Sequence, residues 1–414
     1  MRVLYITHNG LADHIGQSQV LPYLLGLAKD GFAITVVSAE KKQNNALCRE
    51  IAAQVQPAGI DWHHVSYHNW PPLVSTVFDL FRMYRISTSI ARDSDIGLLH
   101  CRSFLPTLIG LFIKKKFDIP LIFDFRDFWA DRGLYSNRFK FVYRFFKRRE
   151  GSMVRKADHN ITLTERAKLI LHQSYLEDCG QTSNERITVI PTCADTDLFD
   201  TRNISTADRL SIRDRLGINA GEFVFGYLGT FHEDYIPREM FRAFLGLRAI
   251  VGSAKFLFIS PSSRDEIINY AKACGVAESD VCVVSATRAE VPKYLSVIDM
   301  SVVFIRPDRS TAGVSPTKLA ELFACNIPVL ANAGVGDMDD IVSPDVNDSV
   351  LVRDFSDETL TQAITQLLSI VCSKQRHGRE ASMKFSLSEG IRRYSTVYSR
   401  YVQPVRSSCS TSLS

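Results

Sequence analysis

Residues 300–331 read MSVVFIRPDRSTAGVSPTKLAELFACNIPVLA and hold two apolar runs, 300–306 and 327–331, on either side of a helical pattern. Neither run alternates polar and apolar residues as a strand with one solvated face does. Such runs are typical of parallel strands that are buried on both faces and joined through a helix. This strand–helix–strand unit therefore predicts an α/β fold with a parallel sheet.

The same pattern recurs along the whole chain. We predict strands at 2–7, 33–38, 96–100, 120–125, 159–163 and 187–191 in the first half, and at 222–229, 255–260, 281–285, 300–306, 327–331 and 349–353 in the second half. Two sets of six strands, each interleaved with helices, predict two doubly wound, Rossmann-like domains. Ligands of open α/β sheets bind beyond the carboxyl ends of the strands, so we expect an interdomain cleft there.

The polar, aspartate-rich stretch 192–221 has no strand pattern and marks the domain boundary. We predict an N-terminal domain over 1–200, a C-terminal domain over 201–385 and a final segment over 386–414. The final segment begins with a helical pattern that we expect to return to the N-terminal domain, and it ends in a frayed tail.

The composition is that of a globular protein. The 414 residues are 45% hydrophobic and 23% charged, and the nine cysteines form no C-x-x-C pair. These values exclude a disordered chain and a disulfide scaffold, and they favour free thiols in a reducing compartment. The longest uncharged apolar stretch, 103–113, is too short to span a bilayer, and no signal-peptide pattern follows Met1. We expect a cytoplasmic protein that can bind a membrane only at its surface.

The strongest local signal is the start of the helical pattern that follows the strand at 300–306. Ser315 is a natural N-cap, Pro316 suits the first helical position and Asn326 suits the stop. Because a helix N-terminus has free N–H groups and partial positive charge, it favours a phosphate. Lys318 has the wrong sign for that end of a helix unless an anion is near, and Glu321, one turn on, could accept ribose hydroxyls. The alternative is a capped surface helix with a Lys–Glu pair.

This helix resembles the donor-binding helix of glycosyltransferase family 4. Other segments resemble landmarks of that family in the same order: GQSQVLPYLLGLAKDGF (16–32), LLHCRSFLPTLIG (98–110), IFDFRDFWADR (122–132), ADHNITLTERAK (157–168), VIPTCADTDLF (189–199) and FVFGYLGT (223–230). The resemblance implies a GT-B fold and a retaining transferase that uses a nucleotide sugar.

Carried over position by position, the resemblance implies a set of site residues. Ser315 to Lys318 would meet the donor diphosphate, and Glu321 would hold the ribose. The implied donor-binding residues are Gly16, Gly229, Thr230, Arg288, Arg306, Ser315, Pro316, Thr317, Lys318 and Glu321. The implied catalytic residues are Arg126, Asp127 and Lys318, and the implied acceptor-side residues are Gln17, His100, Arg102 and Trp129.

Three positions depart from the family pattern. Gly313 stands where the first of two glutamates is usual, Arg126 stands where histidine is frequent, and the segment after Gly229 lacks the usual Arg and Lys. Positive charge for a diphosphate would then come from Lys318 and from arginines of other segments. These departures leave open a non-catalytic glycosyltransferase-like partner subunit, and a GT-B phosphorylase or epimerase.

Other polar residues have structural alternatives. Arg126 and Asp127 could form an ordinary ion pair at a strand end, and His100 could be a satisfied structural histidine. The three histidines of DWHHVSYHNW (61–70) match no zinc spacing, so we expect an aromatic-rich acceptor-side loop there. The resemblance implies front-face substitution, in which the leaving diphosphate takes the acceptor proton, so we expect no cofactor and no essential metal.

Residues 135–156 hold eight Lys or Arg, one acidic residue and six aromatic residues. At helical spacing the aromatic residues could face the core and the basic residues the solvent. The alternative is a surface that docks on anionic lipid, with KKKF at 114–117 adding charge. We expect no nucleic-acid partner, because nothing else in the chain resembles an RNA- or DNA-binding module.

The leading hypothesis is a retaining, hexosyltransferase-type glycosyltransferase. It would move a sugar from a nucleotide sugar to a saccharide or lipid-linked acceptor in polysaccharide or glycolipid biosynthesis. A dinucleotide-dependent oxidoreductase is disfavoured, because THNGLADHIGQ (7–17) has Gly10 and Gly16 but no G-x-G-x-x-G, and Glu40 is its only supporting residue.

Overall fold

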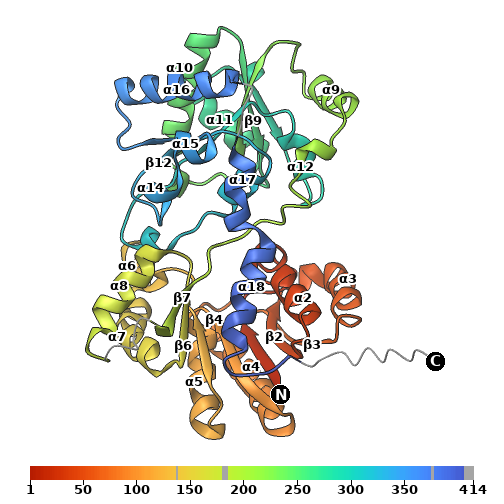
Figure 1. The fold of residues 1–414 in the computed structure, drawn as a ribbon, viewed down its shortest axis with the longest axis vertical. Coiled ribbons are helices and arrows are strands. Elements are labelled where there is room, and N and C mark those ends of the chain that lie inside the picture. Colours follow the sequence, from red (N-terminus) through yellow and green to blue (C-terminus); the bar gives the residue numbers. More distant parts are fainter. Residues whose placement is uncertain (137–138, 180–184, 374–376, 405–414) are drawn as a thin grey trace, which may run out of the picture. The chain divides into compact units, whose positions relative to one another are not determined.

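A computed structural model describes residues 1–136, 139–179, 185–373 and 377–404. The chain forms two compact units (Figure 1). The first unit takes residues 1–191 and the segment that starts at Leu387, and the second unit takes Thr192–Ser386. The chain therefore leaves the first unit once and returns to it at helix α18 (Leu387–Tyr398).

The first unit is built on a parallel sheet. Within the described residues its strands are β1 (Arg2–Thr7), β2 (Ile34–Glu40), β3 (Ile60–Ser66), β4 (Ile96–Arg102), β5 (Leu121–Asp124), β6 (His159–Thr162) and β7 (Ile187–Val189). They lie in the order β3-β2-β1-β4-β5-β6-β7. The strand order reverses beside β1, so β1 and β4 flank the switch point of a doubly wound sheet, where such folds bind ligands.

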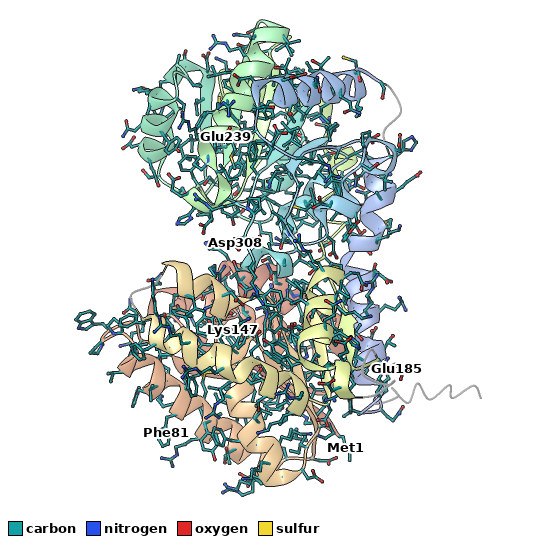
Figure 2. All side chains as sticks on the ribbon, turned by 90° about the vertical axis from the view of Figure 1, so that its left-hand side faces the viewer. Met1, Phe81, Lys147, Glu185, Glu239 and Asp308 are labelled. Atoms are coloured by element: carbon teal, nitrogen blue, oxygen red, sulfur yellow. The ribbon has the colours of Figure 1, made fainter. Side chains whose placement is uncertain are left out.

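Helices cover this sheet. They are α1 (His14–Gln19), α2 (Leu21–Lys29), α3 (Asn45–Val55), α4 (Val74–Asp93), α5 (Phe104–Phe117), α6 (Trp129–Ser136), α7 (Lys140–Lys156), α8 (Glu165–Tyr175) and α18. Helices α4, α5, α7 and α8 pack as successive neighbours, whereas α18 packs against α2. Figure 2 shows the first unit from the side of α4, α5, α7 and α8, and it labels Phe81 of α4 and Lys147 of α7.

Strand β3 corrects the sequence analysis, which predicted a loop over 61–70. Residues 60–66 pair along the whole length of β2 and form the sheet edge. Only Ile60 and Val65 of β3 are buried, and the residues between them face outward in part. An edge strand with this much solvent contact carries no continuous apolar run, which is the signal used for the other strands.

The second unit is built on another parallel sheet. Within the described residues its strands are β8 (Phe223–Leu228), β9 (Ala254–Ile259), β10 (Val281–Val284), β11 (Met300–Val303), β12 (Val329–Asn332) and β13 (Val350–Val352), in the order β10-β9-β8-β11-β12-β13. Its helices are α9 (Thr206–Arg215), α10 (Pro237–Val251), α11 (Arg264–Ala273), α12 (Val291–Leu295), α13 (Thr317–Ala324), α14 (Met338–Ile341), α15 (Pro344–Asn347), α16 (Asp357–Cys372) and α17 (Gly378–Ser382). The predicted α/β class with two parallel, doubly wound sheets is confirmed.

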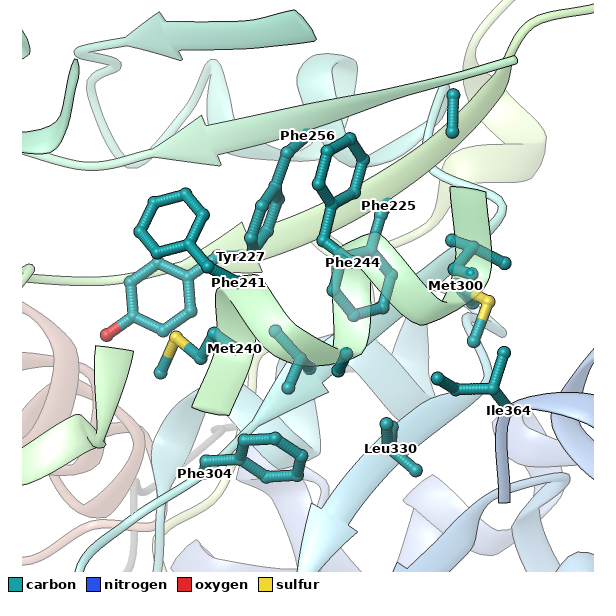
Figure 3. Packing of buried hydrophobic residues seen from close by; sticks show 14 of the residues in the cluster. Phe225, Tyr227, Met240, Phe241, Phe244, Phe256, Met300, Phe304, Leu330 and Ile364 are labelled. Atoms are coloured by element: carbon teal, nitrogen blue, oxygen red, sulfur yellow. The ribbon is translucent and has the colours of Figure 1, made fainter. Parts of the chain in front are cut away.

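An aromatic core fixes β8 in the second unit (Figure 3). Tyr227 of β8 and Phe256 of β9 pack with Phe241 and Phe244 of α10, and all four side chains are fully buried. The Phe256 ring lies 5.4 Å from that of Phe241 and 5.2 Å from that of Phe244. Each such burial contributes roughly 1.5–3 kcal/mol. The carboxyl end of β8 is therefore held rigidly.

The link between the units lies at Pro191 and Thr192. The sequence analysis set its boundary at 200 and 201, but residues 192–200 belong to the second unit. The backbone N–H of Thr192 donates to Ser315 Oγ at 3.2 Å, which ties this stretch to the start of α13.

Candidate functional site

Helix α13 begins at Thr317 and not at the predicted position. Pro316 takes the N-cap position with an extended backbone, and no side chain caps the helix. The predicted N-cap, Ser315, was wrong because its hydroxyl is engaged by Thr192. The predicted stop at Asn326 is confirmed: its φ is 59°, in the left-handed region, and its N–H donates to the Phe323 carbonyl at 2.8 Å.

Lys318, in the first turn of α13, lies among aromatic rings. Its Nζ donates to the Tyr227 hydroxyl at 3.2 Å and stands 4.5 Å from that ring centroid. The ring of Tyr235 is still nearer, with its centroid 3.8 Å from Nζ. Two ring faces and a hydroxyl therefore hold the ammonium in place.

The position after β8 must be glycine. Gly229 has φ +122°, and a Cβ there would lie 2.9 Å from the Nζ of Lys318. The next residue, Thr230, accepts a hydrogen bond from the Tyr227 hydroxyl through its carbonyl at 2.6 Å. The turn after β8 and the first turn of α13 therefore form one packed unit around Lys318.

Burial changes the charge balance of Lys318. It lowers the pKa of this lysine to about 7, although the nearby Glu321 carboxylate opposes the change. A lysine with this pKa is poised between its neutral and charged forms at neutral pH. A negatively charged group beside it would favour its charged form.

Glu321 lies one turn further along α13 and is buried, whereas Lys318 is half-buried. Its Oε1 accepts a hydrogen bond from Arg288 Nη1 at 2.9 Å, and the Arg288 guanidinium lies 5.1 Å from the Phe199 ring. Burial raises the pKa of Glu321, and the charges of Arg288 and Lys318 offset this only in part. Arg288 thus orients a carboxylate that can accept hydroxyl hydrogens.

Arg306 is placed differently from Lys318. Its side chain is exposed, and its Nη2 donates to the Glu233 carbonyl at 3.1 Å while its N–H donates to the Asp234 carbonyl at 2.8 Å. These residues form the 3-10 turn Glu233–Tyr235, which carries the Tyr235 ring. Arg306 therefore supports the Lys318 site through this turn.

A buried polar network lies in the first unit at the carboxyl ends of β4 and β5. His100 Nδ1 lies 2.8 Å from the Tyr398 hydroxyl, and His100 Nε2 lies 3.4 Å from Asp124 Oδ2. Arg126 Nη1 lies 3.3 Å from Asp124 Oδ1 and 3.4 Å from the Tyr394 hydroxyl. Strands β4 and β5 and helix α18 therefore all contribute to it.

A second arginine joins this network. Arg102 Nη2 donates to Gln19 Oε1 at 2.9 Å, and Arg126 Nη2 donates to the same oxygen at 3.2 Å. In the described part of the chain, Arg126 Nε is buried and has no hydrogen-bond partner. Two guanidinium groups and one carboxylate, Asp124, leave an excess of positive charge in this network. Burial lowers the pKa of His100 and so disfavours a further positive charge on its imidazole.

Burial and charge act in opposite directions on Asp124. Burial disfavours its ionised form, but the charge of Arg126 and the hydrogen bond with His100 prevail and hold the pKa of Asp124 well below its usual range. Burial and the charge of Arg126 lower the pKa of Arg102. The network is therefore set for an ionised Asp124 between two cations.

The remaining predicted residues of the first unit have structural contacts. Asp127 pairs with Arg132 at 3.0 Å, and burial raises its pKa. The Trp129 ring packs against Tyr143 at 4.7 Å and Phe146 at 5.3 Å, in an aromatic cluster under α7. The structure thus joins Asp127 and Trp129 to neighbouring side chains of α6 and α7.

The loop after β1 is closed by Glu40. The Glu40 carboxylate accepts from the backbone N–H groups of Leu11 at 2.6 Å and Ala12 at 3.2 Å. A Cβ on Gly16 would lie 2.0 Å from the Gly10 carbonyl oxygen, so this glycine is needed for packing. Since Glu40 already occupies these N–H groups, they do not offer a dinucleotide phosphate site.

Gln17 also stabilises this loop. It lies in α1, and its Nε2 donates to the Ala12 carbonyl at 3.2 Å. The loop and α1 are therefore held together by Gln17 on one side and Glu40 on the other.

A cavity of about 230 Å³ lies at the opposite, carboxyl end of α13. Arg379 lines it and donates to the carbonyls of Thr196 at 3.0 Å, Phe199 at 3.2 Å and Ala324 at 2.7 Å. It also pairs with Asp200 at 3.1 Å. This cavity is a junction of chain segments, distinct from the Lys318 site.

Sequence reasoning missed the residues that complete both sites. In the sequence, Tyr227 and Tyr235 have the pattern of core aromatic residues, and Gln19 has the pattern of an ordinary helix residue. Tyr394 and Tyr398 come from the far end of the chain. No local pattern marks them, because only the fold brings them to Lys318 and His100.

Two further findings concern the described residues as a whole. Within them, no group of three or more His, Cys, Asp or Glu side chains is arranged to hold a metal ion. Searching the same residues also reveals no helix with the length and apolar character that crossing a membrane requires.

Two family profiles match the chain. The profile described as Glycosyltransferase Family 4 matches residues 19–198, and the one described as Glycosyl transferases group 1 matches residues 222–369. No curated protein matches the chain in sequence.

Solved structures match the fold over nearly the whole length. A glycosyltransferase of Rickettsia africae has a TM-score of 0.71 at 14% identity, over 98% of this chain and 99% of its own. The HepE protein of Anabaena, solved with UDP and glucose, has a TM-score of 0.67 at 15% identity, over 96% and 99%. Sucrose-phosphate synthase of Thermosynechococcus elongatus has a TM-score of 0.68 at 15% identity, over 96% of this chain and 98% of its own. These likenesses confirm the predicted GT-B-like fold.

Proposed function

Because the chain belongs to glycosyltransferase family 4, whose members transfer a sugar from a nucleotide sugar, we propose that α13 holds the donor and that the reaction is a retaining transfer. The observation that carries this proposal is the pair Lys318 and Glu321, which lie one turn apart and are held by separate partners, with Lys318 half-buried and Glu321 buried. A cation at the N-terminus of a helix suits a diphosphate. A buried carboxylate one turn on suits the two ribose hydroxyls.

The donor-side residues then divide by role. Lys318 meets the diphosphate together with the backbone of Thr317, while Gly229 and Thr230 let the turn after β8 approach it. Ser315 and Pro316 set where the helix starts, and Arg288 orients Glu321. Arg306 steadies the turn that carries Tyr235 over Lys318.

A hexose attached to a nucleoside diphosphate is the proposed donor. The HepE protein of Anabaena, a relative in fold, was solved with UDP-glucose. The proposed acceptor is a saccharide or a lipid-linked saccharide, in polysaccharide or glycolipid assembly.

The acceptor side is proposed for the polar network of the first unit. Arg126, with Asp127, would contact the sugars, and His100 and Arg102 would support it. The unpartnered Arg126 Nε favours this, because a sugar hydroxyl would satisfy a buried donor whose isolation costs roughly 1–3 kcal/mol. Gln17 and Trp129 are proposed at the border of this site.

A non-catalytic partner subunit is the second candidate. It is favoured by Gly313, which is buried in the 3-10 turn Ser310–Gly313 and cannot supply the carboxylate that the family pattern has there. A phosphorylase or an epimerase remains a third candidate, which would need inorganic phosphate or no acceptor at all.

The test is thermal unfolding with UDP, GDP, ADP or CDP, followed by a turnover assay with the matching sugar nucleotide. One diphosphate at about 100 times its Kd should add about 2.7 kcal/mol of stability. Glu321→Gln should weaken that nucleotide by roughly 10- to 100-fold, because a charged hydrogen-bond acceptor contributes about 1.5–3 kcal/mol.

The matched control is Glu358→Gln on the exposed face of α16, which should leave nucleotide affinity unchanged. Equal affinity in Glu321→Gln and the wild type would contradict the ribose assignment. Nucleotide binding without transfer or donor hydrolysis would favour the partner subunit.

A further inference from the structure

Helix α4 of the first unit carries large apolar residues on its solvent-facing side. Val74, Val77, Phe78 and Phe81 recur at helical spacing and are 67%, 66%, 52% and 55% exposed. A helix that packs on a sheet normally turns such a stripe inward. The outer face of α4 is therefore apolar where solvent alone would select polar side chains.

The inner face of α4 carries mainly small and polar residues. Its buried residues are Ser75, Asp79, Met83, Ser87 and Ala91, of which only Met83 is a large apolar side chain. Asp79 accepts from the backbone N–H of His68 at 2.7 Å and lies 2.6 Å from His68 Nδ1. Asp79 and the buried Met83 therefore help to fix the helix to the first unit, and its outer apolar residues are left available for another surface.

Further exposed apolar side chains continue this face. Trp70, just before α4, is 78% exposed, and Phe112 of α5 is 64% exposed. The Phe112 ring lies 6.3 Å from that of Tyr84, which joins α5 to α4. Phe141 and Phe145 of α7 are also exposed, and α7 packs against α5. We call the exposed apolar residues of 70–81, Phe112, Phe141 and Phe145 the apolar face.

The apolar face is bordered by positive charge. The Arg82 guanidinium lies 5.8 Å from the Phe78 ring, and that of Arg149 lies 5.1 Å from the Phe145 ring. The exposed basic residues on the three helices are Arg85, Arg92, Lys115, Lys116, Lys140, Arg144, Arg148, Arg149, Arg155 and Lys156. Among the described residues of α4, α5 and α7, the only exposed carboxylate is that of Asp93, at the end of α4.

We propose that the apolar face docks on an anionic lipid bilayer. Tryptophan and phenylalanine side chains enter the boundary between head groups and acyl chains, while neighbouring Arg and Lys reach the lipid phosphates. In Figure 2 the label Phe81, at the lower left, marks the part of this face that α4 contributes. The predicted lipid contact over 135–156 becomes the basic border of this surface, except that 137 and 138 lie outside the described residues.

Charge decides between a bilayer and a second copy of the chain. A symmetric dimer would place the same patch on both sides of its interface. Each cationic border would then face a cationic border, which opposes association. An anionic surface instead neutralises the charges. This docking does not depend on the proposed function, since it needs neither donor nor acceptor.

The test is co-sedimentation of the full chain with vesicles of phosphatidylcholine alone or mixed with phosphatidylglycerol. Binding should be at least about tenfold stronger to the mixed vesicles, since one basic residue near an anionic surface gives about a fivefold gain. Val77→Glu with Phe81→Glu should reduce binding at least tenfold to the mixed vesicles. Arg144→Glu with Arg148→Glu should remove most of the preference for phosphatidylglycerol.

The matched control is Leu210→Glu with Ile250→Glu, which changes residues of the second unit that are 62% and 48% exposed. This variant should bind vesicles like the wild type. Nucleotide-dependent stabilisation should be the same in every variant, which separates a lost lipid surface from a lost fold or donor site. Equal binding to both kinds of vesicle, or unchanged binding by the α4 variant, would overturn the proposal. So would light scattering that shows a dimer in the wild type and a monomer in the α4 variant.

Discussion

Nucleoside diphosphate binding should weaken steeply as the pH rises above neutrality, because Lys318 loses its proton there. Burial lowers the pKa of this lysine to about 7 in the folded protein. A diphosphate at the start of α13 favours the charged ammonium and so raises the pKa again. Binding must then take up a proton, and the cost of that proton grows with pH.

The size of the effect follows from the two pKa values. If the bound complex keeps Lys318 charged, the apparent Kd scales with one plus the ratio of neutral to charged lysine in the free protein. Between pH 7.5 and pH 9 that factor grows about 25-fold. The second ionisation of phosphate, near pH 6, is complete over this range and adds nothing.

Titration calorimetry in two buffers with different ionisation enthalpies measures the proton directly. About one proton per ligand should be taken up at pH 8.5, since nearly all free protein is then neutral at Lys318. Lys318→Met should bind weakly and equally at pH 7.5 and pH 9. The reasoning fails if the wild-type Kd changes less than threefold over this range, or if the methionine variant keeps the same slope.

Urea denaturation tests three further expectations. Gly229→Ala should lower the free energy of unfolding by at least about 2 kcal/mol, because a side chain at this φ is strained and meets the Lys318 ammonium. The control Gly217→Ala, at φ +65° with open space around it, should lower it by only about 1 kcal/mol. Equal losses would contradict the close approach of Gly229 to Lys318. Tyr398→Phe should lower the free energy of unfolding by about 1–3 kcal/mol, because it leaves the buried His100 imidazole without its hydroxyl partner. A change near zero would mean that this hydrogen bond is not made. Arg379→Leu should lower the free energy of unfolding by about 3 kcal/mol, because three carbonyls lose their guanidinium donor while Asp200 keeps only its pair with Arg202. A loss below about 1 kcal/mol would reject its role as a junction.

Most of the fold could be predicted from sequence because buried parallel strands have a local signature. Twelve strands were predicted from continuous apolar runs, and each has its counterpart in the two sheets. Strand β3 was missed because an edge strand with Asp61, His63 and His64 shares its composition with a loop. Pairing with β2 stabilises it, and pairing is a property of the fold and not of the segment.

The candidate site was predictable only where function lies in one segment. Lys318 and Glu321 are three residues apart, so the helical repeat alone predicts that they lie on the same face of the helix. Ser315 misled the prediction, since its hydroxyl could cap a helix but binds Thr192. The aromatic partner Tyr235 of Lys318 lies far away in sequence, and nothing in its own segment marks it.

The return of α18 to the first unit has a consequence for synthesis. Tyr394 and Tyr398 reach the network around His100 only after the ribosome has made the entire second unit. Domains generally fold as they emerge, N-terminal first. Until its last helix arrives, the nascent first unit carries Arg126 and His100 without their tyrosine partners. Gene fragments cut at the boundary between the units would therefore leave this half unfinished, and splitting the enzyme calls for co-expression of the missing helix.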